Sequence, residues 1–397
     1  MTAAVSRVPM AIIGAGAVLL LLTFGQRAGI GLFLEPVSKA HGWGREVFAL
    51  AVAISQLMWG VAQPFAAALA EARGTARVIV AGTLLCAASM ILTPLADTPL
   101  ALHLSFGVLG GLGLSAVSFG VVFGAIGRMV PDDQRSWAMG LGTAAASFGQ
   151  VLMVLLSQAF LATFGWQQSL VILGLMSLGA LAIAPLLRGR NPVAAGQQSL
   201  GEALREAGSH AGYWYLIAGF FVCGFHVTFL QTHLPAYLKD QGLPAQAGAW
   251  CLMLIGAANV IGSYAAGVIG QRRSKKGSLA SIYLARAVVI AGFILLPTSE
   301  ASAYVFSFLM GLLWLSTVPL TSGLVGQIFG PRYMGTLFAI VFLSHQVGAF
   351  CGGWLGGRLF DTTGSYSVVW WTAVVLAVLA TLLHLPIDER RVQPATA

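Results

Sequence analysis

Two side chains within apolar segments, Arg27 and His226, are the residues of this sequence best suited to binding chemistry. Arg27 lies in the first apolar stretch, where a permanent positive charge costs ~2.5–3.5 kcal/mol on translocon-insertion scales. The nearest acidic residue, Glu35, is about two helical turns away on the same predicted helix. A charge at this depth pairs with another group, faces a wet cavity or holds a ligand. Arg27 therefore predicts an anion site, in which its planar fork grips a carboxylate.

His226 adds a group that titrates near neutral pH, so we expect it to bind the substrate or carry a proton. The alternatives are structural: a histidine satisfied by helix packing, and an Arg27 bonded to backbone carbonyls or glutamine side chains. Other polar side chains in apolar segments outline the same predicted lumen, because burying them without partners is costly. These candidates are Gln26, Gln56, Gln150, Asn259, Thr317, His345 and Gln346.

The positions of the acidic residues bear on how protons could be coupled to transport. No aspartate or glutamate lies at the middle of an apolar segment, which disfavours proton coupling through a buried carboxylate. If protons are coupled, a histidine or the carboxyl group of the substrate must carry them. Arg286, in the ninth apolar segment, is expected to snorkel or to brace a neighbouring helix.

Composition fixes the class of protein. Of the 397 residues, 57% are hydrophobic and 9% are charged, whereas soluble domains carry about 25% charged residues. This deficit predicts an all-α polytopic membrane protein embedded in a lipid bilayer. The net charge of +8 is scattered over short loops, which argues against nucleic-acid binding. The four cysteines fall within apolar segments and predict packing, with no metal site or cofactor. No signal peptide is evident.

Twelve apolar segments are long enough to cross a hydrocarbon core of ~30 Å as helices. Fifteen lysines and arginines lie in loops or tails on the side of the termini, against four on the other side. This asymmetry predicts cytoplasmic termini and, for a bacterial chain, an inner-membrane location. The predicted spans are 10–38, 44–70, 77–96, 99–129, 136–163, 167–187, 213–238, 246–270, 278–297, 301–329, 333–359 and 366–386.

The sequence repeats itself at an offset of about 200 residues. Gly25-x-Arg27 and Gly224-x-His226 correspond, and each is followed nine residues later by a proline. We therefore predict two pseudo-symmetric six-helix bundles, 1–187 and 213–397, joined by a cytoplasmic linker over 188–212. In that linker, Ser199–Glu206 is predicted to form a short surface helix. Further glycines match at the same offset: Gly149 with Gly348, and Gly165 with Gly364.

The loop after the second span resembles the G-x-L-A-D-R-x-G-R-R signature of the major facilitator superfamily. The resemblance implies two bundles that rock about a central site, and a gating role for this loop, whose acid pairs across a helix interface and favours one conformation. It is carried by Glu71, Arg73, Gly74 and Arg77, with a degraded copy at Gln271, Arg272 and Arg273. The alternative is that these are ordinary loop charges on the cytoplasmic side. Ala67, Ala72, Thr75 and Ala76 depart from the signature.

A narrower resemblance, to monocarboxylate-porter and oxalate/formate-antiporter relatives, rests on Gly107-x-x-Gly110-Gly111-x-Gly113, Arg128, Arg135, Gly140 and Gly165-Trp166. Those relatives place a basic residue in the eighth span, and this chain has none between Cys251 and Gly270.

The sequence leaves three candidate functions for this chain. The first is a monomeric secondary transporter of a small organic anion, most simply a monocarboxylate, coupled to a proton or counter-anion. The second is an efflux carrier for amphipathic or drug-like compounds. The third, a membrane enzyme or receptor, has little support, because the sequence holds no nucleophile–base pair or metal-ligand spacing. In the repeat alignment Arg27 and His226 are counterparts, so we expect them to face each other across the central site.

Overall fold

The computed structural model describes residues 7–129, 132–187, 200–330 and 334–392, and within them every regular element is a helix. Eleven of the described stretches are long and apolar enough to cross a membrane. The longest, Leu141–Leu187, has 47 residues, which at 1.5 Å per residue is ~70 Å, about twice the hydrocarbon thickness. Gly165 interrupts it with φ 75° and ψ 174°. The stretch is therefore two spans, and the predicted all-α fold of twelve spans is confirmed.

We refer to residues 7–187 as the N-terminal half and to residues 200–392 as the C-terminal half. The N-terminal half contains α1 (Arg7–Ala28), η1 (Ile30–Phe33), α2 (Leu34–His41), α3 (Arg45–Arg73), α4 (Thr75–Leu92), η2 (Thr93–Leu95), α5 (Pro99–Leu102), η3 (His103–Leu109), α6 (Gly110–Ala116), α7 (Phe119–Met129), α8 (Asp132–Ser177), α9 (Ala180–Ile183) and η4 (Ala184–Leu187). The C-terminal half contains α10 (Leu200–Ser209), α11 (Ala211–Asp240), α12 (Ala245–Arg272), α13 (Lys275–Leu295), α14 (Glu300–Leu313), α15 (Thr317–Phe329), α16 (Met334–Thr363) and α17 (Ser367–His384).

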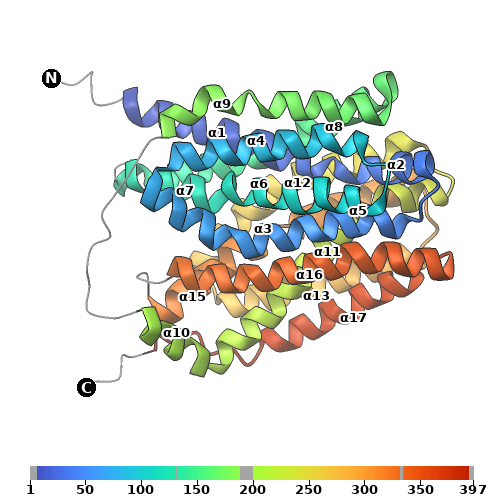
Figure 1. Cartoon of the computed structure of the whole chain (residues 1–397). Coiled ribbons are helices and arrows are strands. Elements are labelled where there is room, and N and C mark those ends of the chain that lie inside the picture. Colours follow the sequence, from blue (N-terminus) through green and yellow to red (C-terminus); the bar gives the residue numbers. More distant parts are fainter. Residues whose placement is uncertain (1–6, 130–131, 188–199, 331–333, 393–397) are drawn as a thin grey trace.

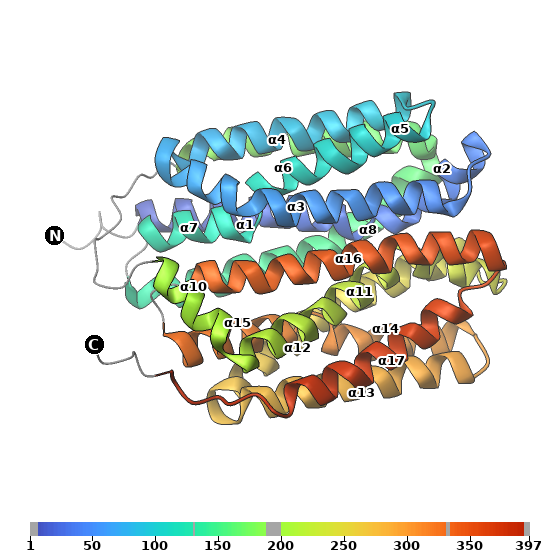
Figure 2. The ribbon, with the colours of Figure 1, turned by 60° about the horizontal axis from the view of Figure 1, so that its bottom comes forward.

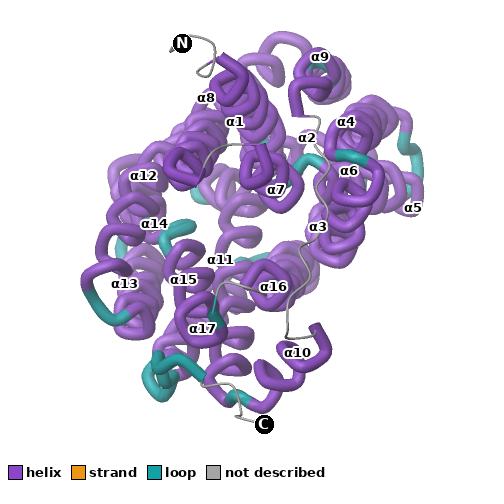
Figure 3. The backbone as a smooth tube through the Cα atoms, turned by 90° about the vertical axis from the view of Figure 1, so that its left-hand side faces the viewer, coloured by secondary structure: helices purple, strands orange, loops and turns teal. Residues whose placement is uncertain are grey.

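The start of α1 and the described segment after α17 lie at the same end of the molecule (Figure 1), as an even number of spans requires. Figure 2 shows α1, α3, α4 and α6 above α11, α13, α16 and α17. Viewed along the helices, α1–α9 gather on one side and α10–α17 on the other (Figure 3). Residues 188–199 of the predicted linker lie outside the described residues, and Ser199 with them; α10 follows directly.

Glycines let helices pack backbone against backbone at two equivalent seams. A Cβ on Gly149 of α8 would lie 2.1 Å from the carbonyl oxygen of Leu21 in α1. A Cβ on Gly348 of α16 would lie 1.9 Å from that of Phe221 in α11. Only glycine permits this approach. Because the two contacts are about 200 residues apart, the repeat seen in the sequence is also a repeat in space.

The loop after the second span is reduced to one residue. Gly74, with φ 97°, joins α3 directly to α4, a conformation that glycine adopts without strain. Arg73 and Arg77 are exposed beside it, and the side chain of Glu71 lies outside the described residues. The second copy, Gln271, Arg272 and Arg273, is exposed at the end of α12. A gating role for either loop stays a prediction.

Ionic contacts join the two halves at the end opposite the termini, the predicted outer end. Arg45 binds Asp240 through two hydrogen bonds of 2.6 and 2.7 Å, and its Nη1 also donates to Tyr366 at 3.1 Å. Lys239 pairs with Glu35 at 2.7 Å. The molecule is therefore closed at this end by contacts between its halves.

The start of α3 adds to this closure. The Asp361 carboxylate accepts from the backbone N–H groups of Arg45 and Glu46 at 3.0 and 2.8 Å. It thereby places a negative charge from the C-terminal half at the positive end of α3. Glu46 in turn pairs with Arg358 at 3.0 Å.

Candidate functional site

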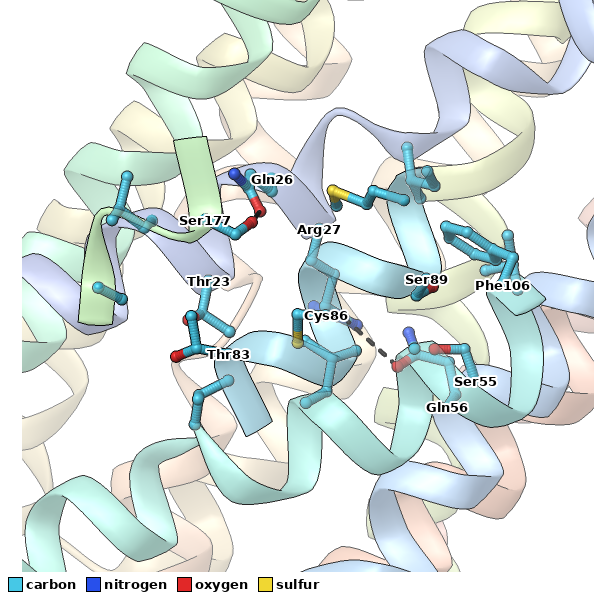
Figure 4. Close-up of a pocket in the computed structure, with 18 of the residues that line it drawn as sticks. Thr23, Gln26, Arg27, Ser55, Gln56, Thr83, Cys86, Ser89, Phe106 and Ser177 are labelled. Atoms are coloured by element: carbon cyan, nitrogen blue, oxygen red, sulfur yellow. Dashed lines mark hydrogen bonds between the residues drawn. The ribbon is translucent and has the colours of Figure 1, made fainter. Parts of the chain in front are cut away.

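A cavity opens beside Arg27, within the N-terminal half and against α11 (Figure 4). About 70 Å³ of it is accessible to the centre of a water molecule. One water needs ~10–15 Å³ on this measure, so the space holds a group of about five to seven water-sized units. Hydroxyl, thiol and aromatic side chains face it, including Thr23, Ser55, Thr83, Cys86, Ser89 and Phe106.

Arg27 comes from the last turn of α1 and lines this cavity. Its Nε lies 3.4 Å from Oε1 of Gln56 on α3 (Figure 4). With the Gln56 amide turned by half a rotation, its oxygen accepts from Nη2 of Arg27 at 2.7 Å and from the Thr228 hydroxyl at 3.2 Å. No carboxylate among the described residues forms an ion pair with Arg27. Among the described residues, the polar contact that holds this charge is therefore the neutral amide of Gln56.

Aromatic rings border Arg27. The guanidinium carbon lies 5.3 Å from the centre of the Trp59 ring, within cation–π range. Trp59 contacts Phe24 of α1 and Phe342 of α16, with ring centres 5.7 and 5.4 Å apart. Trp59 therefore contacts the charge directly, and its contact with Phe342 brings α16 of the other half close to the site.

Gln56 also connects the site to the C-terminal half. Its backbone carbonyl accepts from Nε2 of Gln346 on α16 at 3.0 Å. The Gln346 oxygen lies 2.9 Å from Nδ1 of the preceding His345. Both side chains are buried. The structure therefore joins Arg27, Gln56, Gln346 and His345, all predicted site residues, in one hydrogen-bonded chain.

His226 is not opposite Arg27, which corrects our geometric expectation. It is fully buried, and its Nε2 lies 2.8 Å from the carbonyl oxygen of Ala373 on α17. The residue of α11 that meets the partner of Arg27 is Thr228. Two residues along a helix are about 200° apart around its axis, so when Thr228 faces the N-terminal half His226 points away from it.

The remaining predicted residues occupy three places. Gln26 lines the cavity but is tied to the sixth span: its Nε2 donates to the Leu173 carbonyl and its oxygen accepts from Ser177, each at 2.8 Å. Gln150 of α8 packs against Gly256 of α12. Nearby, Nδ2 of Asn259 donates to the Ser147 hydroxyl of α8 at 3.3 Å.

Thr317 lies inside the C-terminal half, where its hydroxyl is 3.2 Å from the Cys223 sulfur. Arg286 is the second arginine at membrane depth. Its side chain is fully buried and donates to the carbonyls of Leu313 and Trp314. It braces a neighbouring helix, one of its two expected roles, and does not snorkel to the surface.

Several cavity residues were not predicted. Thr83 and Thr232 line the cavity, and their hydroxyls are buried without a hydrogen-bond partner among the described residues. Ser55, Ser89 and Thr228 also belong to the site. Hydroxyl residues are common in membrane helices, so their types alone carried no signal; their positions relative to Arg27 and Gln56 became visible only with the helix rotations.

Twelve spans in two related halves, with a cavity near their interface that contains a charge, define a membrane transporter. The sequence matches the Major Facilitator Superfamily over residues 16–350. The chain belongs to this family and is a secondary transporter of small molecules in the lipid bilayer, not an enzyme.

Relatives cover most of the chain at low identity. The chain is 24% identical over 374 residues to the uncharacterized MFS-type transporter YcxA of Bacillus subtilis, covering 90% of each chain. It is 25% identical over 394 residues to monocarboxylate transporter 13 of Rattus norvegicus, covering 92% of this chain and 86% of the relative.

Solved structures share the fold. A D-xylose-proton symporter superposes with a TM-score of 0.79 at 14% identity, covering 96% of this chain and 99% of that one. A bacterial homolog to the human lysosomal transporter Spinster, in an inward-facing and unoccupied conformation, gives 0.76 at 16% identity over 98% of this chain and 100% of that one.

Proposed function

We propose that this chain transports a small organic anion, most simply a monocarboxylate, whose carboxylate binds Arg27. The observation that carries the proposal is a guanidinium that lines a cavity and pairs with no carboxylate of the described chain. Such a charge at membrane depth is costly, and an anion that enters the cavity lowers that cost. A carboxylate in the cavity supplies that neutralisation and matches the guanidinium fork.

The cavity limits what accompanies the carboxylate. Its accessible volume suits a molecule of a few heavy atoms. The unpartnered hydroxyls of Thr83 and Thr232 offer hydrogen bonds to a second polar group on the ligand. Similarity to monocarboxylate transporter 13 of Rattus norvegicus supports the same substrate class.

One observation favours the second candidate, an efflux carrier for amphipathic compounds. Phe24, Trp59 and Phe342 form an aromatic contact between the halves beside the site, and Phe119 adds a ring centre 4.3 Å from that of Phe24. Such surfaces bind flat apolar molecules without needing a charge. The two candidates differ in whether Arg27 is required.

The cellular setting follows from the charge of the loops. We propose a monomer in the bacterial inner membrane, with both termini in the cytoplasm and with coupling to a proton or a counter-anion. The excess of lysine and arginine in the loops on the side of the termini supports this orientation.

The experiment measures uptake of radiolabelled acetate, propionate, pyruvate and lactate into proteoliposomes. We expect at least one acid to be transported, and Arg27→Gln to raise its KM by about tenfold or more, because a charged hydrogen bond contributes ~1.5–3 kcal/mol. The control is Arg390→Gln, which changes an arginine that is 92% exposed outside the spans. Unchanged KM in a folded Arg27→Gln protein would refute the proposal. Resistance to drug-like compounds that survives Arg27→Gln would support the efflux carrier instead.

A further inference from the structure

The fourth and tenth spans are broken at equivalent places in the two halves. In the tenth span α14 ends at Leu313 and α15 begins at Thr317. In the fourth span α6 ends at Ala116 and α7 begins at Phe119, about 200 residues earlier. A break in a membrane helix leaves backbone groups without helical partners, and these need partners inside the protein.

The two breaks differ in whether side chains of other helices bind them. Near the break of the fourth span, the side chains of Ser115 and Ser118 donate to carbonyls of their own segment, at 2.7 and 3.2 Å. Near the break of the tenth span, Ser316 likewise donates to the Leu312 carbonyl at 2.6 Å, but side chains of two other helices, α12 and α13, bind the break as well. The tenth span is therefore held from outside, which makes its shape depend on those helices.

Arg286 of α13 is the first holder. Its Nη2 donates to the Leu313 carbonyl at 2.7 Å and also to the Trp314 carbonyl. Leu313 is the last residue of α14 and Trp314 is its C-cap, so these carbonyls lie where the helix dipole places partial negative charge. Arg286 is fully buried, and its Nε and Nη1 have no partner among the described residues. The C-terminus of α14 is thus what receives this buried cation.

Asn259 of α12 is the second residue that binds the break, and its side chain contacts both the tenth span and the N-terminal half. Its Oδ1 accepts from the backbone N–H of Leu315 at 3.0 Å. Its Nδ2 donates to the Ser147 hydroxyl at 3.3 Å, on α8 of the N-terminal half. Close packing fixes α12 against α14, because a Cβ on Gly262 would lie 1.9 Å from the carbonyl oxygen of Leu312. One side chain therefore links the break directly to the other half.

We propose that Arg286 and Asn259 are positioning residues that set the bend of the tenth span and couple it to the separation of the two halves. Arg286 anchors the end of α14 within the C-terminal half. Asn259 keeps its hydrogen bond with the N–H of Leu315 while its Nδ2 also donates to Ser147, and it loses that bond when Ser147 moves away. When the halves part at this level, the break loses one holder and α15 is free to turn about it.

The test uses hydrogen–deuterium exchange of the peptide that covers residues 313–317 in purified protein without substrate. We expect Ser147→Ala to speed its exchange by about fivefold, the equivalent of one hydrogen bond, although Ser147 does not touch this segment. Ser147→Thr keeps the hydroxyl and should exchange like the parent. Ser169→Ala is the matched control, since its buried hydroxyl bonds the Gly165 carbonyl in its own helix.

The coupling is measured in an Arg286→Lys background, which keeps the charge but not the planar fork. If Arg286 and Asn259 act together at the break, Ser147→Ala speeds exchange of residues 313–317 by less than a further twofold in this background, because Arg286→Lys has already weakened the contacts at the break. Equal factors in both backgrounds overturn the proposal, since residues that do not interact act independently. If Arg286→Lys does not fold, the serine variants decide: no change with alanine, or equal change with threonine, overturns it. None of these exchange measurements uses a substrate. Their outcome is therefore independent of the proposal that the chain transports an organic anion.

Discussion

The ion pair between Arg45 and Asp240 should set how often the predicted outer end opens. Asp240→Asn keeps the shape of the side chain but removes its charge and one of its two acceptor oxygens. The lost interaction is a charged hydrogen bond of 2.6–2.7 Å between the halves, which is worth ~1.5–3 kcal/mol. Because the Asp240 side chain is 30% exposed, solvent screening favours the lower figure.

A loss of ~1.5 kcal/mol changes an equilibrium constant by about tenfold. The pair joins the halves only while this end is closed, so we expect the population open at this end to rise by about that factor relative to the closed one. Spin labels are attached to cysteines introduced at Ala40 and Ala245, both exposed near this end. Double electron–electron resonance then measures the distance between the two halves. The distribution should gain a longer component.

The matched control is Asp388→Asn, which alters an acid that is 61% exposed in the C-terminal tail and lies 4.0 Å from Arg390. It should leave the distance distribution unchanged. High salt should shift the parent protein in the same direction as Asp240→Asn, because ions screen the exposed part of the pair. An Asp240→Asn protein with the distribution of the parent would refute the reasoning.

Three further outcomes are expected. Gly165→Ala should lower the thermal midpoint, because φ 75° strains any other residue, whereas Gly292→Ala, in open space inside a helix, should raise it slightly; equal shifts would contradict this account. Gly348→Ala should destabilise by more than ~2 kcal/mol, since its Cβ would meet a carbonyl oxygen of α11, and an unchanged midpoint would count against the seam. Binding of a transported carboxylate should alter tryptophan fluorescence, and Trp59→Phe should remove the change because Trp59 lies against the guanidinium; a change retained in Trp59→Phe would disprove that assignment.

The number and place of the spans could be predicted from the sequence because they depend on long runs of apolar residues. The equivalence of Gly165 and Gly364 was also predictable, and both have positive φ, 75° and 69°. Such features follow from local chemistry and from a repeat that can be read along the chain. They need no knowledge of how helices rotate about their axes.

The orientation of side chains could not be predicted in the same way. A rotation of 100° per residue decides whether His226 or Thr228 faces Gln56, and both are compatible with the apolar pattern around them. The role of Arg286 depended on a break in another span, which exposes the carbonyls of Leu313 and Trp314. The types of these residues can be read along the chain, but their partners depend on how the helices pack.

The glycine seams have a consequence for how this protein can diverge. The contacts of Gly149 with Leu21 and of Gly348 with Phe221 leave no room for another side chain, so mutational tolerance there should be very low. Thr83 and Ser89 lie on α4, away from both seams. At the proposed site, specificity can therefore drift by exchange of these small polar residues while the framework stays constant, which would separate the evolution of ligand choice from the maintenance of stability.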